Sequence, residues 1–84
     1  MKLFDMIVYD RACDLRIPFY TAIYNGHLYK VYLPNGFDCY KYKVYDCIKV
    51  KGTINGNEIV AVNITNDECD IKGLYRLQSH INTL

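Results

Sequence analysis

The sequence has little of what several protein classes need. Among 84 residues there are only two prolines and five glycines, which excludes a collagen-like repeat and a low-complexity tail. Ten basic residues face nine acidic ones for a net charge of +1, which excludes a strongly basic protein that wraps nucleic acid. No apolar run approaches the roughly 18–20 residues of a membrane helix. Asp5 and Asp10 interrupt the stretch where a secretory signal would be apolar. We therefore expect one small globular domain over residues 1–84, located in the cytoplasm and away from membranes.

Motifs for catalysis and cofactor binding are also missing. The sequence contains no Gly-rich phosphate loop and no H-E-x-x-H pair. The acidic cluster around Asp67 and Asp70 lacks the glycine and terminal glutamate of a calcium loop. His27 and His80 could assist a Cys or Ser nucleophile, but no spacing places them beside one, and we expect both on the surface. The sequence therefore predicts a protein that is not an enzyme and uses no cofactor.

The four cysteines show no spacing typical of a metal or redox site. None of them forms a C-x-x-C pair; they are Cys13, Cys39, Cys47 and Cys69. An even number of cysteines in a short secreted chain would indicate disulfides. Because we expect a cytoplasmic protein, we predict instead four reduced, metal-free thiols that pack as small apolar side chains.

The abundant residues indicate the kind of genome that encodes the chain. Tyr, Ile, Asn and Lys are frequent, whereas Ala, Arg and Pro are scarce. The first group has AT-rich codons and the second has GC-rich codons, so we predict an AT-rich genome, as in many bacteriophages.

The pattern is β over most of the chain. Asn-Gly pairs at 25–26, 35–36 and 55–56 indicate hairpin turns, because both residues tolerate a positive φ angle. The first strand is expected at 3–9, followed by a polar connection at 10–14. Strands 19–24 and 27–33 then form a hairpin around Asn25-Gly26. Its better core face contains Tyr20, Ala22, Tyr24, Tyr29, Val31 and Leu33.

The second turn, at 34–36, is expected to place Phe37 opposite Leu33 and Cys39 opposite Val31. The strand-like residues 38–51 would then continue as one long strand, with a bend at Tyr45-Asp46 because so long a strand does not fit a small domain.

The third turn offers a choice of register. A two-residue turn at Asn55-Gly56 would place lysines on the apolar face of the hairpin. A three-residue loop at 54–56 instead places Val50 opposite Val60 and Ile48 opposite Val62. We therefore predict a bulged loop, with those four side chains buried and Lys49 and Lys51 exposed.

The C-terminal segment is consistent with two structures. We favour a helical turn near residue 67, a closing strand at 71–77 and a tail, while the spacing of Leu74, Leu77, Ile81 and Leu84 would also suit a short C-terminal helix. The overall fold class is mainly β. We expect a small antiparallel meander that forms a curled sheet or a partly open SH3-like or OB-like barrel.

Nine tyrosines are more than so small a core can bury, since each hydroxyl needs a polar partner. We expect Tyr9, Tyr32 and Tyr45 on the surface, where tyrosine is enriched in protein interfaces. The favoured function is a protein-binding module, such as a phage-type inhibitor or modulator of a host protein. It would act through these tyrosines and a strand edge, which could also pair with a second copy of the chain.

The alternative function uses lysines. If residues 40–51 form one strand, then four lysines share a face, and with Tyr40, Tyr42 and Tyr45 they could bind single-stranded nucleic acid or a nucleotide; the lysines are Lys41, Lys43, Lys49 and Lys51. Lysines on the wet face of a strand are, however, ordinary solubilising residues. The balanced charge, with Asp38 and Asp46 among these lysines, favours a protein partner.

Overall fold

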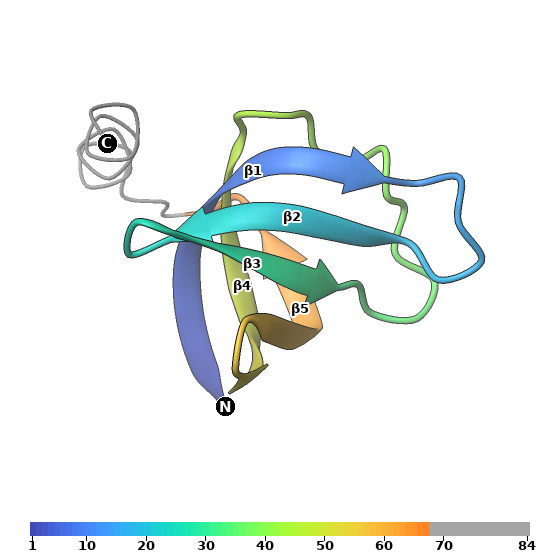
Figure 1. Ribbon diagram of the computed structural model, residues 1–84. Helices are drawn as coiled ribbons and strands as arrows, with labels where there is room; N and C mark the ends of the chain where they lie inside the picture. The colour runs from blue at the N-terminus through green and yellow to red at the C-terminus, as the bar shows by residue number, and fades with distance from the viewer. Residues whose placement is uncertain (68–84) are drawn as a thin grey trace.

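The computed structural model describes residues 1–67, which form a closed five-stranded barrel (Figure 1). Its strands follow the order β1-β2-β3-β5-β4 around the barrel. The long first strand closes the barrel because it pairs with β2 along one half and with β4 along the other. The predicted mainly-β barrel of the SH3/OB-like class is therefore confirmed. The strands are β1 (Lys2–Ala12), β2 (Phe19–Tyr24), β3 (His27–Tyr32), β4 (Cys47–Asn55) and β5 (Glu58–Thr65).

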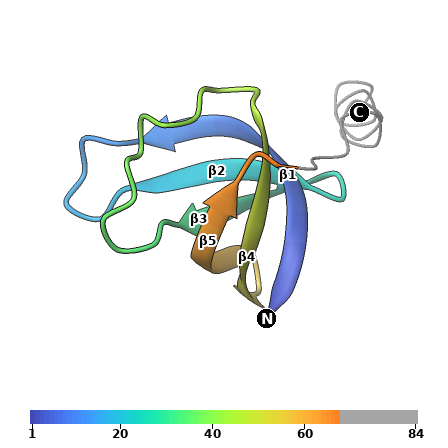
Figure 2. The same cartoon turned by 180° about the vertical axis from the view of Figure 1, so that it is seen from behind.

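The order of the strands differs from the predicted antiparallel meander. Strand β3 pairs with β5 in parallel, so that Val31 lies opposite Ile59 and not opposite Cys39. The turn after β3 does form, since the Phe37 N–H donates to the Pro34 carbonyl at 3.0 Å. The chain then runs on as a loop over residues 33–46 instead of returning as a strand (Figure 2). A non-sequential order of this kind matches the Greek-key arrangement of OB-type barrels.

The β2–β3 hairpin has the predicted register. Tyr24 pairs with His27, and the two turn residues Asn25 and Gly26 have φ angles of 50° and 79°. Both central residues of such a two-residue turn require positive φ, which is why Asn-Gly is favoured there. The predicted core face is also confirmed. Tyr20, Ala22 and Val31 are buried, and Tyr24, Tyr29 and Leu33 pack against them.

The predicted register of the β4–β5 hairpin is wrong. Asn55 pairs with Glu58 around a two-residue turn at 56–57, and Thr53 lies opposite Val60. Val60 and Val62 are 57% and 47% exposed, whereas the buried residues of β5 are Ile59, Ala61 and Ile64. Ile48 and Val50 are buried as predicted.

A bulge in the ladder, not in the turn, explains this register. Gly52 pairs with Ala61 but Lys51 pairs with Asn63, which leaves Val62 as the extra residue. One extra residue reverses the side-chain alternation, so Val50 faces Ile64 inside the barrel. Lys51 is exposed as predicted, whereas Lys49 is half-buried.

The bulge requires a glycine at position 52, and this gives a testable prediction. A Cβ atom there would overlap the Val60 carbonyl oxygen across the ladder. Because the obstacle is backbone, we expect Gly52→Ala to lower the free energy of unfolding by about 2–3 kcal/mol, measured by urea denaturation. Gly56→Ala is the control: Gly56 has φ +61° and open space around it, so it should cost only about 1 kcal/mol. Equal losses from both variants would contradict the tight approach at Gly52.

The expected helical turn, closing strand and tail at 67–84 lie almost wholly outside the described residues. Within residues 1–67, no helix is long and apolar enough to cross a membrane.

Candidate functional site

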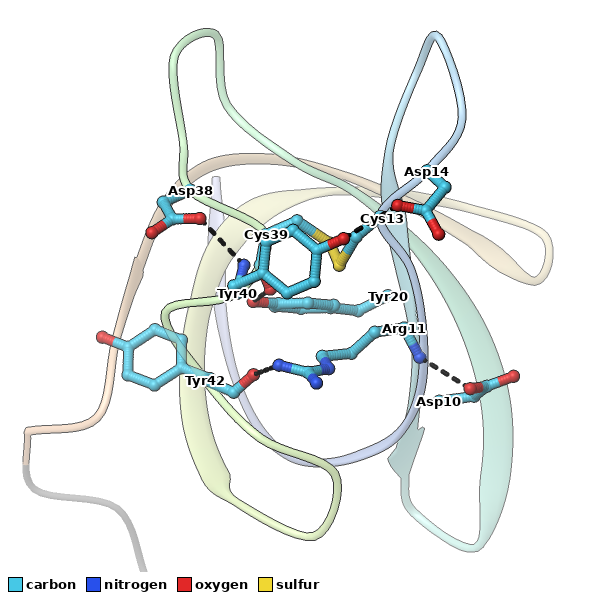
Figure 3. Close-up of a disulfide and its surroundings, with 9 residues drawn as sticks. All are labelled: Asp10, Arg11, Cys13, Asp14, Tyr20, Asp38, Cys39, Tyr40 and Tyr42. Atoms are coloured by element: carbon cyan, nitrogen blue, oxygen red, sulfur yellow. Dashed lines mark hydrogen bonds between the residues drawn. A yellow bond between two sulfur atoms is a disulfide. The ribbon is translucent and has the colours of Figure 1, made fainter.

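A disulfide joins two loops over one end of the barrel (Figure 3). Cys13 follows β1 and Cys39 lies in the loop between β3 and β4, with their Cα atoms 5.5 Å apart. The prediction of reduced thiols is therefore wrong for these two residues and also for Cys47, which does not carry a free thiol. In the described part of the chain no cysteine is a free thiol. The prediction for Cys69 lies outside that part. Nothing in the sequence indicated this pairing, because it depends on the fold bringing two distant loops together.

The tyrosine beneath the disulfide fixes the loop to the core. Tyr20 is fully buried, and its hydroxyl donates to the Cys39 carbonyl at 2.6 Å. Burial raises the pKa of this hydroxyl. A buried hydroxyl needs such a partner, so the bond anchors the loop to β2.

Three further contacts hold the same loop to the end of β1 and to the residues that follow it. The Arg11 guanidinium donates to the Tyr42 carbonyl at 2.7 Å and lies 5.6 Å from the centre of the Tyr40 ring. The Tyr40 hydroxyl donates to Asp14 at 2.8 Å, and this hydrogen bond raises the pKa of Tyr40. Together with the disulfide, these contacts make the loop an ordered cap on the barrel.

The lysines of the nucleic-acid hypothesis do not share one face. Lys41 and Lys43 belong to the capping loop, whereas Lys49 and Lys51 lie on β4. The Lys41 ammonium lies 5.5 Å from the centre of the Tyr42 ring. Lys49 is 3.9 Å from an oxygen of Asp5. The structure therefore does not form the continuous basic strand that the alternation predicted.

Two aspartates explain why this segment is a loop. An Asp38 carboxylate oxygen accepts the Tyr40 N–H at 3.0 Å, and an Asp46 oxygen accepts the Lys43 N–H at 2.8 Å. Such side-chain to backbone bonds compete with strand pairing and favour turns. Asp38 and Asp46 were therefore the sequence signal against a continuous strand.

Two of the three expected surface tyrosines lie on neighbouring segments. Tyr9 is 49% exposed at a bulge of β1, where the ladder to β2 shifts between Val8 and Asp10. Tyr45 is 66% exposed, and its N–H donates to the Val8 carbonyl at 2.6 Å. We call these two residues the Tyr9–Tyr45 pair.

The third tyrosine lies elsewhere. Tyr32 is half-buried on β3, and its hydroxyl donates to Glu58 at 2.9 Å. Its ring centre is 6.4 Å from that of Phe19. The Lys30 ammonium lies over both rings, 5.1 Å from the centre of Tyr32 and 4.3 Å from that of Phe19. Tyr32 is therefore already engaged on its own surface.

The backbone of Tyr45 is in an unfavourable conformation. Its φ angle is +74°, in the left-handed region. Bulky residues are rare there because Cβ approaches the following carbonyl, at a cost of about 1–2 kcal/mol. The predicted bend at Tyr45-Asp46 does occur, since the chain turns there before β4 begins, but no sequence pattern indicated the left-handed φ angle.

A groove lies between the two loops at the capped end of the barrel. It has a volume of about 370 Å³ and is lined by residues 16–18 and 33–37. Sequence reasoning missed these residues. The sequence signal was two aliphatic residues, Leu15 and Ile17, in the connection after the first strand. The structure leaves them 53% and 67% exposed.

Metal binding finds no support in residues 1–67, where no group of three His, Cys, Asp or Glu side chains could hold an ion. His27 is exposed at the start of β3. Comparison of the chain with protein-family models, with curated proteins and with solved structures found no match.

Proposed function

We propose that this barrel is a non-enzymatic protein-binding module whose contact surface includes the Tyr9–Tyr45 pair. The observation that carries the proposal is the exposed Tyr45 ring on a left-handed backbone. Glycine or asparagine would occupy this position with less strain. Strain that persists at an exposed residue is typical of functional sites, because the side chain itself is needed there.

The geometry around Tyr9 supports the same surface. The β1 bulge leaves Tyr9 without an opposite residue on β2, and bulges commonly redirect a side chain near a functional site. Tyrosine gives a large, rigid contact with one polar tip at low cost in conformational entropy. Two exposed tyrosines on adjacent segments therefore suit the centre of a protein interface.

The barrel's closure changes one part of the expected mode of binding. Within residues 1–67 every strand is hydrogen-bonded to a neighbour on both sides. The expected strand-edge contact, with a partner or with a second copy, is therefore limited to short stretches that the ladders leave unpaired, such as residues 61–65 on the β3 side of β5. The proposal accordingly relies on side chains.

The kind of partner remains the one that composition suggests, a host protein bound by a phage-type inhibitor or modulator. The disulfide indicates the compartment in which the protein binds this partner. Disulfides persist in oxidising compartments and are rare in the cytosol. We therefore propose a partner outside the reducing cytoplasm, in place of the cytoplasmic location expected from the sequence.

Replacing Tyr45 separates function from stability. We expect Tyr45→Asn to leave the free energy of unfolding unchanged or to raise it by about 1 kcal/mol, because asparagine tolerates positive φ. The same variant, and Tyr9→Ala, should weaken partner capture about tenfold or more, as loss of an interface hot spot does. Capture is measured by affinity purification from the envelope fraction of bacterial hosts with quantitative mass spectrometry, and stability by urea denaturation.

The matched control is Tyr40→Asn, the same change at another exposed tyrosine. It removes the contacts with Asp14 and Arg11, so it should lower stability slightly and leave capture unchanged. The proposal fails if the Tyr45 variant captures every partner as well as the wild type does.

A further inference from the structure

The groove between the two loops is built on ordered elements. Its first wall follows Cys13, which is bonded to Cys39, and its second wall leads into Phe37. The Phe37 ring packs edge-on against Tyr20 at 6.3 Å and lies 6.0 Å from Tyr42. The groove is therefore largely formed before any ligand arrives, and its volume of about 370 Å³ falls within the usual range of binding sites.

Four of its eight lining residues are aliphatic, and the others include Arg16, Asn35 and Phe37. Ile17 is 67% exposed, and Pro18, Leu33 and Pro34 are half-buried along the two walls. Apolar side chains left in contact with water at a concave site favour a ligand that covers them. An aliphatic side chain of a partner would gain contacts with both walls.

Three basic side chains lie in or beside this lining. Arg16 is exposed in the wall and forms no ion pair with any other described residue. The Lys41 ammonium lies 6.0 Å from the Phe37 ring centre. Lys30 lies over Phe19, the residue that follows Pro18. Two carboxylates also lie near the groove and keep their negative charge: Asp38 follows Phe37, and Glu58 is the ladder partner of Lys30. Arg16 is therefore the positive charge of the wall that no described carboxylate pairs with.

We infer that the groove binds an extended segment of the partner protein in which acidic residues flank an aliphatic side chain. The aliphatic side chain would lie between Ile17 and Leu33, and the acidic residues would approach Arg16, Lys30 and Lys41. This inference rests on the proposed function and names the chemistry of the partner that the protein would recognise.

The same contacts disfavour single-stranded nucleic acid. Bases bind such proteins by stacking on open aromatic faces. Here a lysine ammonium already lies over Phe19 and Tyr32, and another lies over Phe37. A base that stacks on Phe37, the aromatic residue of the lining, would have to displace Lys41.

The test is a titration of the ¹⁵N-labelled full chain with a synthetic peptide, acetyl-Glu-Asp-Leu-Ile-Glu-Asp-amide, up to about 1 mM. We expect amide shift changes confined to the lining residues that have an N–H, which are 16, 17, 33 and 35–37. Arg16→Glu should weaken binding about tenfold, because it replaces an attraction by a repulsion. Peptides with Gln and Asn for the acids, or with Ser for Leu and Ile, should each bind about fivefold more weakly or not at all.

The matched control is Lys51→Glu, which changes the net charge equally but lies on β4, outside the groove lining. It should leave the affinity unchanged. Shift changes spread over the whole barrel, an equal loss in Lys51→Glu, or tighter binding of a deoxythymidine oligonucleotide at residues 16–18 and 33–37 would each overturn the inference.

The two proposals fail separately. Tyr45→Asn should bind the peptide normally, because Tyr45 does not line the groove. If the peptide does not bind while Tyr45→Asn still loses partner capture, then the groove inference is wrong and the proposed function stands. If the peptide binds and Tyr45→Asn captures partners normally, then the Tyr9–Tyr45 pair is not the contact surface.

Discussion

A chain with Cys13→Ala and Cys39→Ala together is expected to lose about 3 kcal/mol of its free energy of unfolding, because the disulfide closes a loop of 26 residues and so restricts the unfolded chain. A domain of 84 residues has a total stability on the order of 4–12 kcal/mol. The loss would therefore remove a large share of it. Alanine is preferable to serine because Cys39 is buried, and a hydroxyl there would need a partner.

Urea denaturation of the wild type and the double variant measures this loss. Hydrogen exchange should rise most at residues 38–42, which the disulfide holds to the barrel. A loss below about 1 kcal/mol would show that the constraint on the unfolded chain is small. Leu15→Ala is a suitable control, because it alters an exposed residue of the same loop and should change stability little.

Truncation of Tyr20 should have an effect of similar size. Tyr20→Ala is expected to cost about 4 kcal/mol, as large-to-small changes of buried aromatic residues do. Tyr20→Phe keeps the ring but leaves the Cys39 carbonyl without its buried donor, so it should cost about 1–2 kcal/mol. If Tyr20→Phe were as stable as the wild type, the hydrogen bond to the loop would not stabilise the cap.

The same residue predicts a dependence on pH. Burial raises the pKa of Tyr20 in the folded state above its ordinary value of 10.0. The folded state therefore prefers the neutral phenol, and this contribution to stability is complete below pH 10 and is lost as the pH rises through the folded-state pKa. Denaturation midpoints measured from pH 8 to 11 should fall more steeply for the wild type than for Tyr20→Phe.

Local signals in the sequence were sufficient for part of the fold. The Asn25-Gly26 turn and the alternation on either side of it fix the β2–β3 hairpin, because turn chemistry and side-chain period agree there. The prediction failed where a single residue changes the outcome. The bulge beside Gly52 reverses the alternation of β5, and the turns capped by Asp38 and Asp46 end what reads as a continuous strand.

The candidate sites were likewise predictable only in part from the sequence. Exposure of Tyr9 and Tyr45 could be predicted from the excess of tyrosine. Their proximity could not, because it depends on the capping loop returning to the β1 bulge. The groove could not be predicted either, because its two walls, residues 16–18 and 33–37, are distant in the chain and the Cys13–Cys39 link joins their loops.

The parallel seam between β3 and β5 also decides how the barrel can open. It contains only three residue pairs, Lys30 to Tyr32 with Glu58 to Val60, whereas the antiparallel ladders are longer. Separation at this seam leaves β3, β2, β1, β4 and β5 connected as one curled sheet with two free edges. Two such opened molecules could exchange strands, each completing the other's barrel. A domain-swapped dimer would then form through slow opening of the seam and not by simple contact of folded surfaces.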